Sequence, residues 1–178
     1  MKHTAGSLLL GALLTIGGCS NRTKAPDVSD NIHNSLDQAG FKDVSVHQDR
    51  DKGVVTLKGT VPSDSEKART ESIAKAQAAG EVVANEIAVV PPGNESAAKT
   101  VNSDIDKAID KNLDAALVQN RLNKAVKYSV KNGVVTLKGQ VDSQAARSEA
   151  AHIAASVPNV TQVVNEVEVR HTRATSSR

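Results

Sequence analysis

Aromatic side chains are almost absent from this sequence. Its 178 residues include one Phe, one Tyr and no Trp. Proteins that bind single-stranded nucleic acid or specific RNA use aromatic rings as stacking platforms, and cages for methylated lysine use them too. The composition argues against these classes and against sheet faces that bind sugars. Because 39% of the residues are hydrophobic, a core is possible, but it must be built from Val, Ala, Leu and Ile.

An excess of charge of one sign is also missing. The 22 Lys and Arg residues stand against 20 Asp and Glu, which gives a formal net charge of +2. This is not the basic footprint of a duplex DNA-binding protein, so we predict no nucleic-acid partner. Glycine-rich motifs of nucleotide sites do not occur. His33, His47, His152 and His171 are scattered without zinc-site spacing, so we predict surface histidines, no metal and no cofactor.

A single cysteine, Cys19, excludes an internal disulfide. It follows a short basic start, an apolar run over residues 5–16 and two glycines, which is the layout of a secretory signal peptide. The run is too short to span a bilayer comfortably. Small residues directly before a cysteine resemble the bacterial lipobox, in which the cysteine is lipidated. We therefore predict a lipoprotein signal peptide over 1–18 and lipid attachment at Cys19.

The alternative is an ordinary signal peptide with an incidental cysteine, which would release a soluble periplasmic protein. Lipidation would have a different result, because two or more acyl chains hold a protein stably at a membrane. Ser20 follows the cysteine. In proteobacterial lipoproteins an Asp at that position often marks retention in the inner membrane, so this resemblance favours the outer membrane.

One segment of the sequence occurs twice. Residues 53–59 (GVVTLKG) recur unchanged at 133–139, an offset of 80. Over the 37 positions that begin there and align without a gap, 15 are identical, too many for chance. The sequence therefore predicts two tandem domains of roughly 65 residues, each near the lower limit for folding alone. Whether the two copies dock is left open.

Each copy begins with an amphipathic helix. Val28, Ile32 and Leu36 lie four residues apart in the first copy, which places them on one helical face. Four apolar residues repeat this spacing in the second copy: Ile105, Ile109, Leu113 and Leu117. Ser103 is the predicted N-cap of this second helix.

Two strands follow the first helix in each copy. Alternating apolar residues predict a strand before the repeated segment, and the segment itself is a predicted strand that ends at its second glycine in a bulge or bend. Asn132-Gly133 is typical of a two-residue hairpin turn, and residues 49–53 suggest a longer one.

A second helix and a last strand complete each copy. Ser63 and Ser143 are the predicted N-caps of the second helix. The last strand is predicted over 83–90 in the first copy and 163–169 in the second. We therefore predict an α+β fold made of two tandem αββαβ domains.

The repeated pattern resembles a known family. G-V-V-T-L-x-G-x-V, a helix with Ile-Ala and then V-x-N-E-[IV]-x-V are similar to the BON domain (bacterial OsmY and nodulation). Two such units behind a lipobox resemble the dual-BON lipoproteins of the bacterial outer membrane. The resemblance implies a three-stranded mixed sheet with two helices in each copy. It also implies phospholipid interaction, a role in envelope integrity under osmotic or other stress, and no catalysis.

These predictions divide the chain into six parts. They are the signal peptide 1–18, a polar tether 19–27, BON domain 1 at 28–91, a linker 92–102, BON domain 2 at 103–170, and a basic disordered tail 171–178. The linker begins in Pro91-Pro92-Gly93 and is predicted to act as a hinge.

The first helix of the second copy is the candidate membrane-contact surface, since the resemblance implies that this helix meets anionic phospholipid. The candidate contact residues are Ile105, Lys107, Ile109, Lys111 and Leu113. The helix has no aromatic residue and its lysines are balanced by aspartates, so a solvated helix face is the alternative interpretation.

Two polar features recur in both copies. Lys58 and Lys138 are predicted to point outward from the repeated strand, towards solvent or towards anionic head groups. The pair Asn-Glu at 85–86 recurs at 165–166 without a nucleophile or a metal partner at matching positions. We predict that it makes turn and edge-strand hydrogen bonds and that the chain has no catalytic residues.

The sequence thus predicts a non-enzymatic lipoprotein of the bacterial cell envelope, facing the periplasm, with the outer membrane favoured. Its expected partners are the membrane, through Cys19, anionic phospholipid and envelope proteins. The alternative is a soluble periplasmic osmotic-stress or chaperone-like protein.

Overall fold

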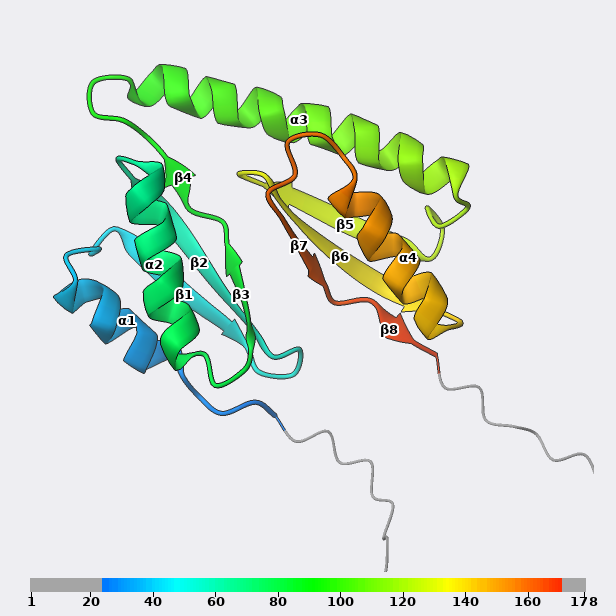
Figure 1. The fold of residues 1–178 in the computed structure, drawn as a ribbon, viewed down its shortest axis with the longest axis horizontal. Coiled ribbons are helices and arrows are strands. Elements are labelled where there is room, and N and C mark those ends of the chain that lie inside the picture. The colour runs from blue at the N-terminus through cyan, green and yellow to red at the C-terminus, as the bar shows by residue number, and fades with distance from the viewer. Residues whose placement is uncertain (1–23, 171–178) are drawn as a thin grey trace, which may run out of the picture.

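The computed structural model of the protein describes residues 24–170 (Figure 1). The predicted signal peptide, the lipid attachment at Cys19, the first part of the tether and the basic tail lie outside the described residues.

The two copies have the same order of elements. The first contains α1 (Ser29–Gln38), β1 (Val44–Asp49), β2 (Val54–Val61), α2 (Asp64–Gln77), β3 (Val82–Asn85) and β4 (Ala88–Val89). The second contains α3 (Glu95–Gln119), β5 (Val126–Lys131), β6 (Val134–Val141), α4 (Gln144–Ala155), β7 (Gln162–Asn165) and β8 (Glu168–Val169).

Each sheet is mixed, with the repeated strand in its centre. β2 lies antiparallel to β1 and parallel to β3 and β4, and β6 pairs in the same way with β5, β7 and β8. The parallel pairing follows from the helix between the strands, which carries the chain back along the sheet. The predicted last strand is one path broken in two, because Glu86 and Ile87 leave the ladder between β3 and β4. The predicted α+β fold with two αββαβ units is confirmed.

Both helices of a copy pack on one face of its sheet, and the core between them is aliphatic (Figure 1). In the first copy Ile32, Leu36 and Leu57 are fully buried. Ile109, Leu113 and Leu137 are their counterparts in the second copy. The helix stripes predicted from the four-residue spacing are therefore the core of each domain.

The predicted turns and caps are present. β5 and β6 are joined by Asn132-Gly133, both with positive φ (47° and 79°), as a type I′ turn requires. The Ser63 hydroxyl accepts the N–H of Glu66 at 3.3 Å, and Ser143 caps α4 in the same way.

The repeated strand does not end at its second glycine, which corrects the prediction. β6 continues through Gly139 to Val141, and β2 continues likewise through Gly59. Gly139 has φ of +124°, and a Cβ there would lie 2.1 Å from the carbonyl oxygen of Ala125. The glycine is therefore required by a close approach of two backbones inside the sheet.

The longest helix, α3, begins eight residues earlier than its predicted N-cap. Ser103 lies within α3, so the N-cap prediction is wrong, and residues 95–102 of the predicted hinge are helical. The segment ESAAKTVN contains a Glu, two Ala and a Lys, which are good helix formers, and the prolines that suggested a hinge stand before the helix, where they do not break it. α3 spans about 37 Å and runs over both copies (Figure 1). Within residues 24–170, no helix is both long and apolar enough to cross a membrane.

The two copies dock through the edges of their sheets at β3 and β7. The Gln162 side chain lies between them: its Nε2 donates to the carbonyl oxygen of Val83 at 2.6 Å, and its Oε1 accepts the N–H of Asn85 at 3.0 Å. One β7 side chain thereby fills two hydrogen-bonding positions on the open edge of β3.

Matching positions of the two copies build the rest of the contact. Val54 and Ala84 form a small buried cluster with their counterparts Val134 and Val164. The hairpin turns also reach across. Asn132 Nδ2 donates to the Glu86 carbonyl oxygen at 2.7 Å, and Lys52 forms an ion pair with Glu168. The repeat therefore produces an interface with approximate two-fold character.

The start of the described chain is bound along the end of β1. The Ala25 N–H donates to the Arg50 carbonyl oxygen at 2.9 Å, and Arg50 Nε donates to the Ala25 carbonyl oxygen at 2.8 Å. Gln48 Nε2 donates to the carbonyl oxygen of Pro26 at 2.6 Å. The second half of the predicted tether 19–27 is therefore part of the folded domain.

Candidate functional site

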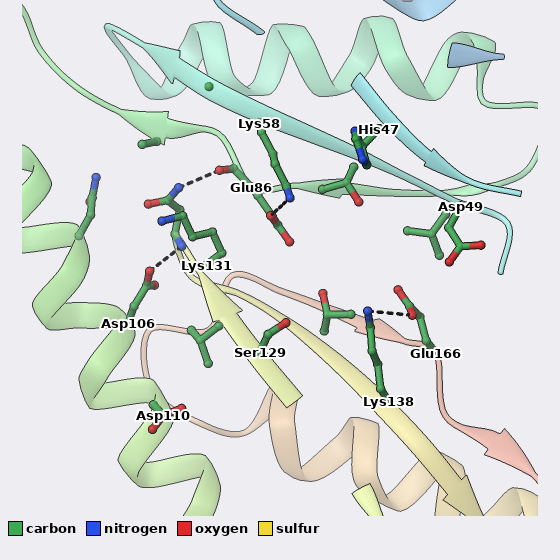
Figure 2. Close-up of a pocket in the computed structure, with 18 of the residues that line it drawn as sticks. His47, Asp49, Lys58, Glu86, Asp106, Asp110, Ser129, Lys131, Lys138 and Glu166 are labelled. Carbon is green, nitrogen blue, oxygen red and sulfur yellow. Dashed lines mark hydrogen bonds and ion pairs between the residues drawn. The ribbon is translucent and has the colours of Figure 1, made fainter. Parts of the chain in front are cut away.

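A large cleft lies between the two copies, with a volume of about 1430 Å³. We call it the interdomain cleft. Its walls are the helix-free faces of the two sheets, and one side is closed by the first half of α3 (Figure 2). The outward-facing residues of both repeated strands therefore face a shared cleft instead of bulk solvent.

Two matching lysine–glutamate pairs stand on opposite walls of the interdomain cleft. Lys58 Nζ lies 3.7 Å from a Glu86 carboxylate oxygen, and Lys138 Nζ lies 3.6 Å from that of Glu166. Figure 2 shows the two lysines entering the cleft from opposite sides. The glutamate side chains are 15% and 9% exposed, whereas the lysines are more than half exposed. The anions are thus held against the sheets and the ammonium groups reach into the cleft.

Asp106 connects α3 to the rim of the cleft. Its two carboxylate oxygens accept the backbone N–H groups of Asn132 and Gly133 at 2.8 and 3.0 Å. Charge-assisted bonds of this kind fix a tight turn firmly. The position of α3 is therefore coupled to the hairpin that contacts the first copy.

The charges that remain unpaired around the cleft are mainly positive. Five of the six acidic lining residues already have partners within the described chain: Asp49, Asp51, Glu86, Asp106 and Glu166. Lys99, Lys111 and Lys131 line the cleft and form no salt bridge with any residue of 24–170. The cleft can therefore attract an anionic group.

The predicted membrane-contact residues are separated by the structure. Ile109 and Leu113 are 0% exposed and belong to the core of the second copy, so their prediction as membrane contacts is wrong for the folded protein. Ile105 is partly buried against the same core. Lys107 and Lys111 are exposed and line the interdomain cleft. The four-residue spacing that suggested a helix face inserting into the membrane arises because this face packs into the core of the second copy.

The repeated Asn-Glu pairs divide between two roles. Asn85 is buried, and its Nδ2 donates to the carbonyl oxygen of Lys67 and to the Glu71 carboxylate, both at 3.1 Å. Burial raises the pKa of Glu71, but the hydrogen bonds from Lys75 and Asn85 outweigh it and leave the pKa below its usual value. The Asn therefore ties the broken strand to α2, a contact that the predicted turn and edge-strand hydrogen bonds did not include, while the Glu faces the cleft.

Tyr128 provides a test of the packing between β5 and α3. Its Oη donates to the carbonyl oxygen of Asp110 at 3.0 Å. Burial, followed by the negative charges of Asp110 and Asp114, raises its pKa to about 12. The neutral phenol is the form that stabilises the fold, so this contribution is complete below pH 10 and is lost as pH rises through about 12.

Because Tyr128 is the only Tyr and Trp is absent, phenolate absorbance reports this residue alone. We expect a midpoint near 12 in the folded protein, against about 10 in urea. Circular dichroism recorded alongside monitors the fold. A midpoint near 10 with the fold intact would contradict the burial of the phenol.

The histidines within residues 24–170 are not gathered into a site. His33, His47 and His152 are exposed as predicted, and His171 lies outside the described residues. Between residues 24 and 170, no group of three or more His, Cys, Asp or Glu side chains could hold a metal ion.

Sequence reasoning missed the interdomain cleft and its key contact. Lys58 and Glu86 were interpreted separately, although adjacent strands of one sheet pair them. Nothing in the sequence around Gln162 indicates that it contacts the other copy. The repeat gives one indication, because the equivalent position in the first copy is Val82, which cannot make the hydrogen bonds that Gln162 makes across the interface.

Comparison with known proteins agrees with the repeat. The family model of the BON domain matches residues 25–91 and 103–171. A protein of Anaplasma centrale, described as an uncharacterized protein in the gshII 5′ region, is 34% identical over 145 residues, which cover 80% of this chain and 92% of the relative.

Two solved structures of CdsD, a structural protein of the type III secretion system of Chlamydia trachomatis, are similar to this chain at a low level. The first, of its C-terminal domain, has a TM-score of 0.32 at 16% identity and covers 81% of this chain and 66% of that one. The second has a TM-score of 0.36 at 14% identity and covers 81% and 92%. Because the model of the BON domain matches two segments that together span most of the chain, the chain belongs to the BON-domain family.

Proposed function

We propose that the protein is a non-enzymatic lipoprotein of the bacterial cell envelope. Its paired BON domains bind anionic head groups of the phospholipid surface and help to maintain the envelope under osmotic or other stress. Lipid at Cys19 holds it at the membrane, with the outer membrane favoured. The lipobox-like sequence before Cys19 supports the anchor.

The observation that carries the binding role is the set of unpaired lysines around the interdomain cleft. Lys99, Lys111 and Lys131 come from two elements and border one opening. Basic residues near an anionic membrane surface each contribute about 1 kcal/mol of attraction at moderate ionic strength. The acidic residues that line the cleft weaken this attraction less than their number suggests, because most of them already have an ion-pair or hydrogen-bond partner. A soluble periplasmic stress protein remains the alternative.

Fractionation of cells separates the anchor from the cleft. We expect the wild-type protein to stay in membranes washed with high salt, because acyl chains are insensitive to salt. The Cys19→Ala variant, secreted behind an ordinary cleavable signal peptide in place of residues 1–18, is expected to be held by the cleft at low salt and released at high salt. Adding Lys111→Gln and Lys131→Gln to Cys19→Ala should abolish the low-salt association.

Two outcomes would contradict the proposal. A Cys19→Ala variant that resists the salt wash rules out the acyl anchor. A Cys19→Ala variant that is fully soluble at low salt rules out head-group binding, and a wild-type protein that is soluble as well supports the soluble alternative. Lys127→Gln, on the same strand as Lys131 but outside the cleft lining, is the matched control for lost positive charge.

A further inference from the structure

The outer face of α3 carries a heptad pattern that the fold does not use. Seven positions follow one another at alternating intervals of four and three residues: Ala97, Val101, Asp104, Ala108, Lys111, Ala115 and Val118. Such spacing places them in one line along the helix, over about 32 Å. We call this line the α3 seam.

Apart from the surface ion pair between Asp104 and Lys107 (3.0 Å) and the position of Lys111 at the edge of the interdomain cleft, the α3 seam makes no contact that the fold uses. All seven residues are exposed, whereas the core side of the helix is formed by Ile109 and Leu113. Val101 is 55% exposed and Val118 is 49% exposed. They are two of the three large apolar side chains that remain exposed within residues 24–170. Figure 1 shows α3 lying along the outside of the molecule.

The charges in the α3 seam favour a second α3 helix in the antiparallel orientation. In a parallel pair of α3 helices Asp104 would face Asp104 and Lys111 would face Lys111. In an antiparallel pair each Asp104 lies one helical turn from Lys111 of the other copy, within reach of an ion pair. We propose that the α3 seam binds a second copy of this chain in an antiparallel helix pair. This inference does not rest on the proposed function, but it shares Lys111 with the interdomain cleft, so its tests read oligomeric state and not membrane association.

The remaining seam residues fit the same arrangement. Antiparallel layering places Val101 of one copy against Val118 of the other at both ends, where the two valines bury each other, and sets the small Ala108 opposite the longer Lys111 in the middle. Beside the seam, Lys107 lies opposite Asp114 of the other copy. The apolar contact is short, which predicts a weak dimer whose population depends on concentration.

Disulfide crosslinking tests the pairing and its direction. The natural Cys19 is replaced by Ser in the secreted chain. Oxidation of a variant with both Val101→Cys and Val118→Cys is then expected to give a covalent dimer, because these positions meet across the seam. Either substitution alone should give none. Crosslinking of a single variant would indicate parallel pairing and overturn the proposal.

Sedimentation of the Cys19→Ser chain over a concentration series supplies the second measurement. We expect a reversible dimer that Asp104→Lys and Lys111→Asp each weaken at least about fivefold. The double exchange should restore it, since opposite charges then meet again. Val82→Ser, at the exposed valine away from α3, is the control. A monomer at every concentration, or a double exchange weaker than either single variant, would refute the proposal.

Discussion

Replacing Gly139 with alanine is expected to unfold or severely destabilise the second copy. The new Cβ would lie 2.1 Å from the Ala125 carbonyl oxygen, so β6 and the start of β5 must separate. Backbone displacement and a strained φ of +124° together should lower the free energy of unfolding by about 3 kcal/mol or more. Urea unfolding followed by circular dichroism measures the loss.

Gly80→Ala is the matched control, because Gly80 also has a positive φ (+88°) but no atom within 4 Å of its would-be Cβ. It should cost only the conformational penalty, about 1 kcal/mol. Equal losses for the two variants would show that the close approach inside the strand is not what requires Gly139. The equivalent Gly59→Ala is expected to behave like Gly139→Ala, since its Cβ would lie 2.0 Å from the Asp43 carbonyl oxygen.

Leu113→Ala separates the two possible roles of the hydrophobic stripe on α3. Leu113 is fully buried in the second core, so its truncation should lower the free energy of unfolding by about 2–5 kcal/mol through lost burial and a cavity. The same urea titration measures it. Val118→Ala, on the exposed side of the same helix, should change the free energy of unfolding by no more than about 0.5 kcal/mol. A stable Leu113→Ala variant would revive the membrane-contact interpretation.

Much of each domain could be predicted because its signals are local. The four-residue spacing of Ile32 and Leu36, the Asn132-Gly133 turn and the Ser63 and Ser143 caps each depend on a few neighbouring residues, and the fold confirms them. The repeat strengthened every assignment by providing it twice. The strand through Gly139 was cut short because the sequence does not show which backbone lies opposite.

The errors lie where distant parts of the chain decide the structure. The linker contained both a proline-glycine break and good helix formers, and only packing of α3 against both copies favours the longer helix. Amphipathic periodicity shows that one helix face is buried but not in what, so core residues such as Leu113 were assigned to a membrane. The interdomain cleft depends on docking through Gln162, for which one sequence has no local indicator.

The hydrogen bonds between Ala25 and Arg50 limit how far the folded domain can lie from a membrane anchor at Cys19. Because the chain is fixed from that point, the distance from Cys19 to the folded domain depends on the residues between Cys19 and Lys24. Covalent geometry limits the distance between these two residues to about 18 Å. A lipidated Cys19 would therefore keep the hairpin of the first copy within that distance of the bilayer surface. Lys24 and Arg50 line the interdomain cleft, so its mouth would be kept close to the head groups.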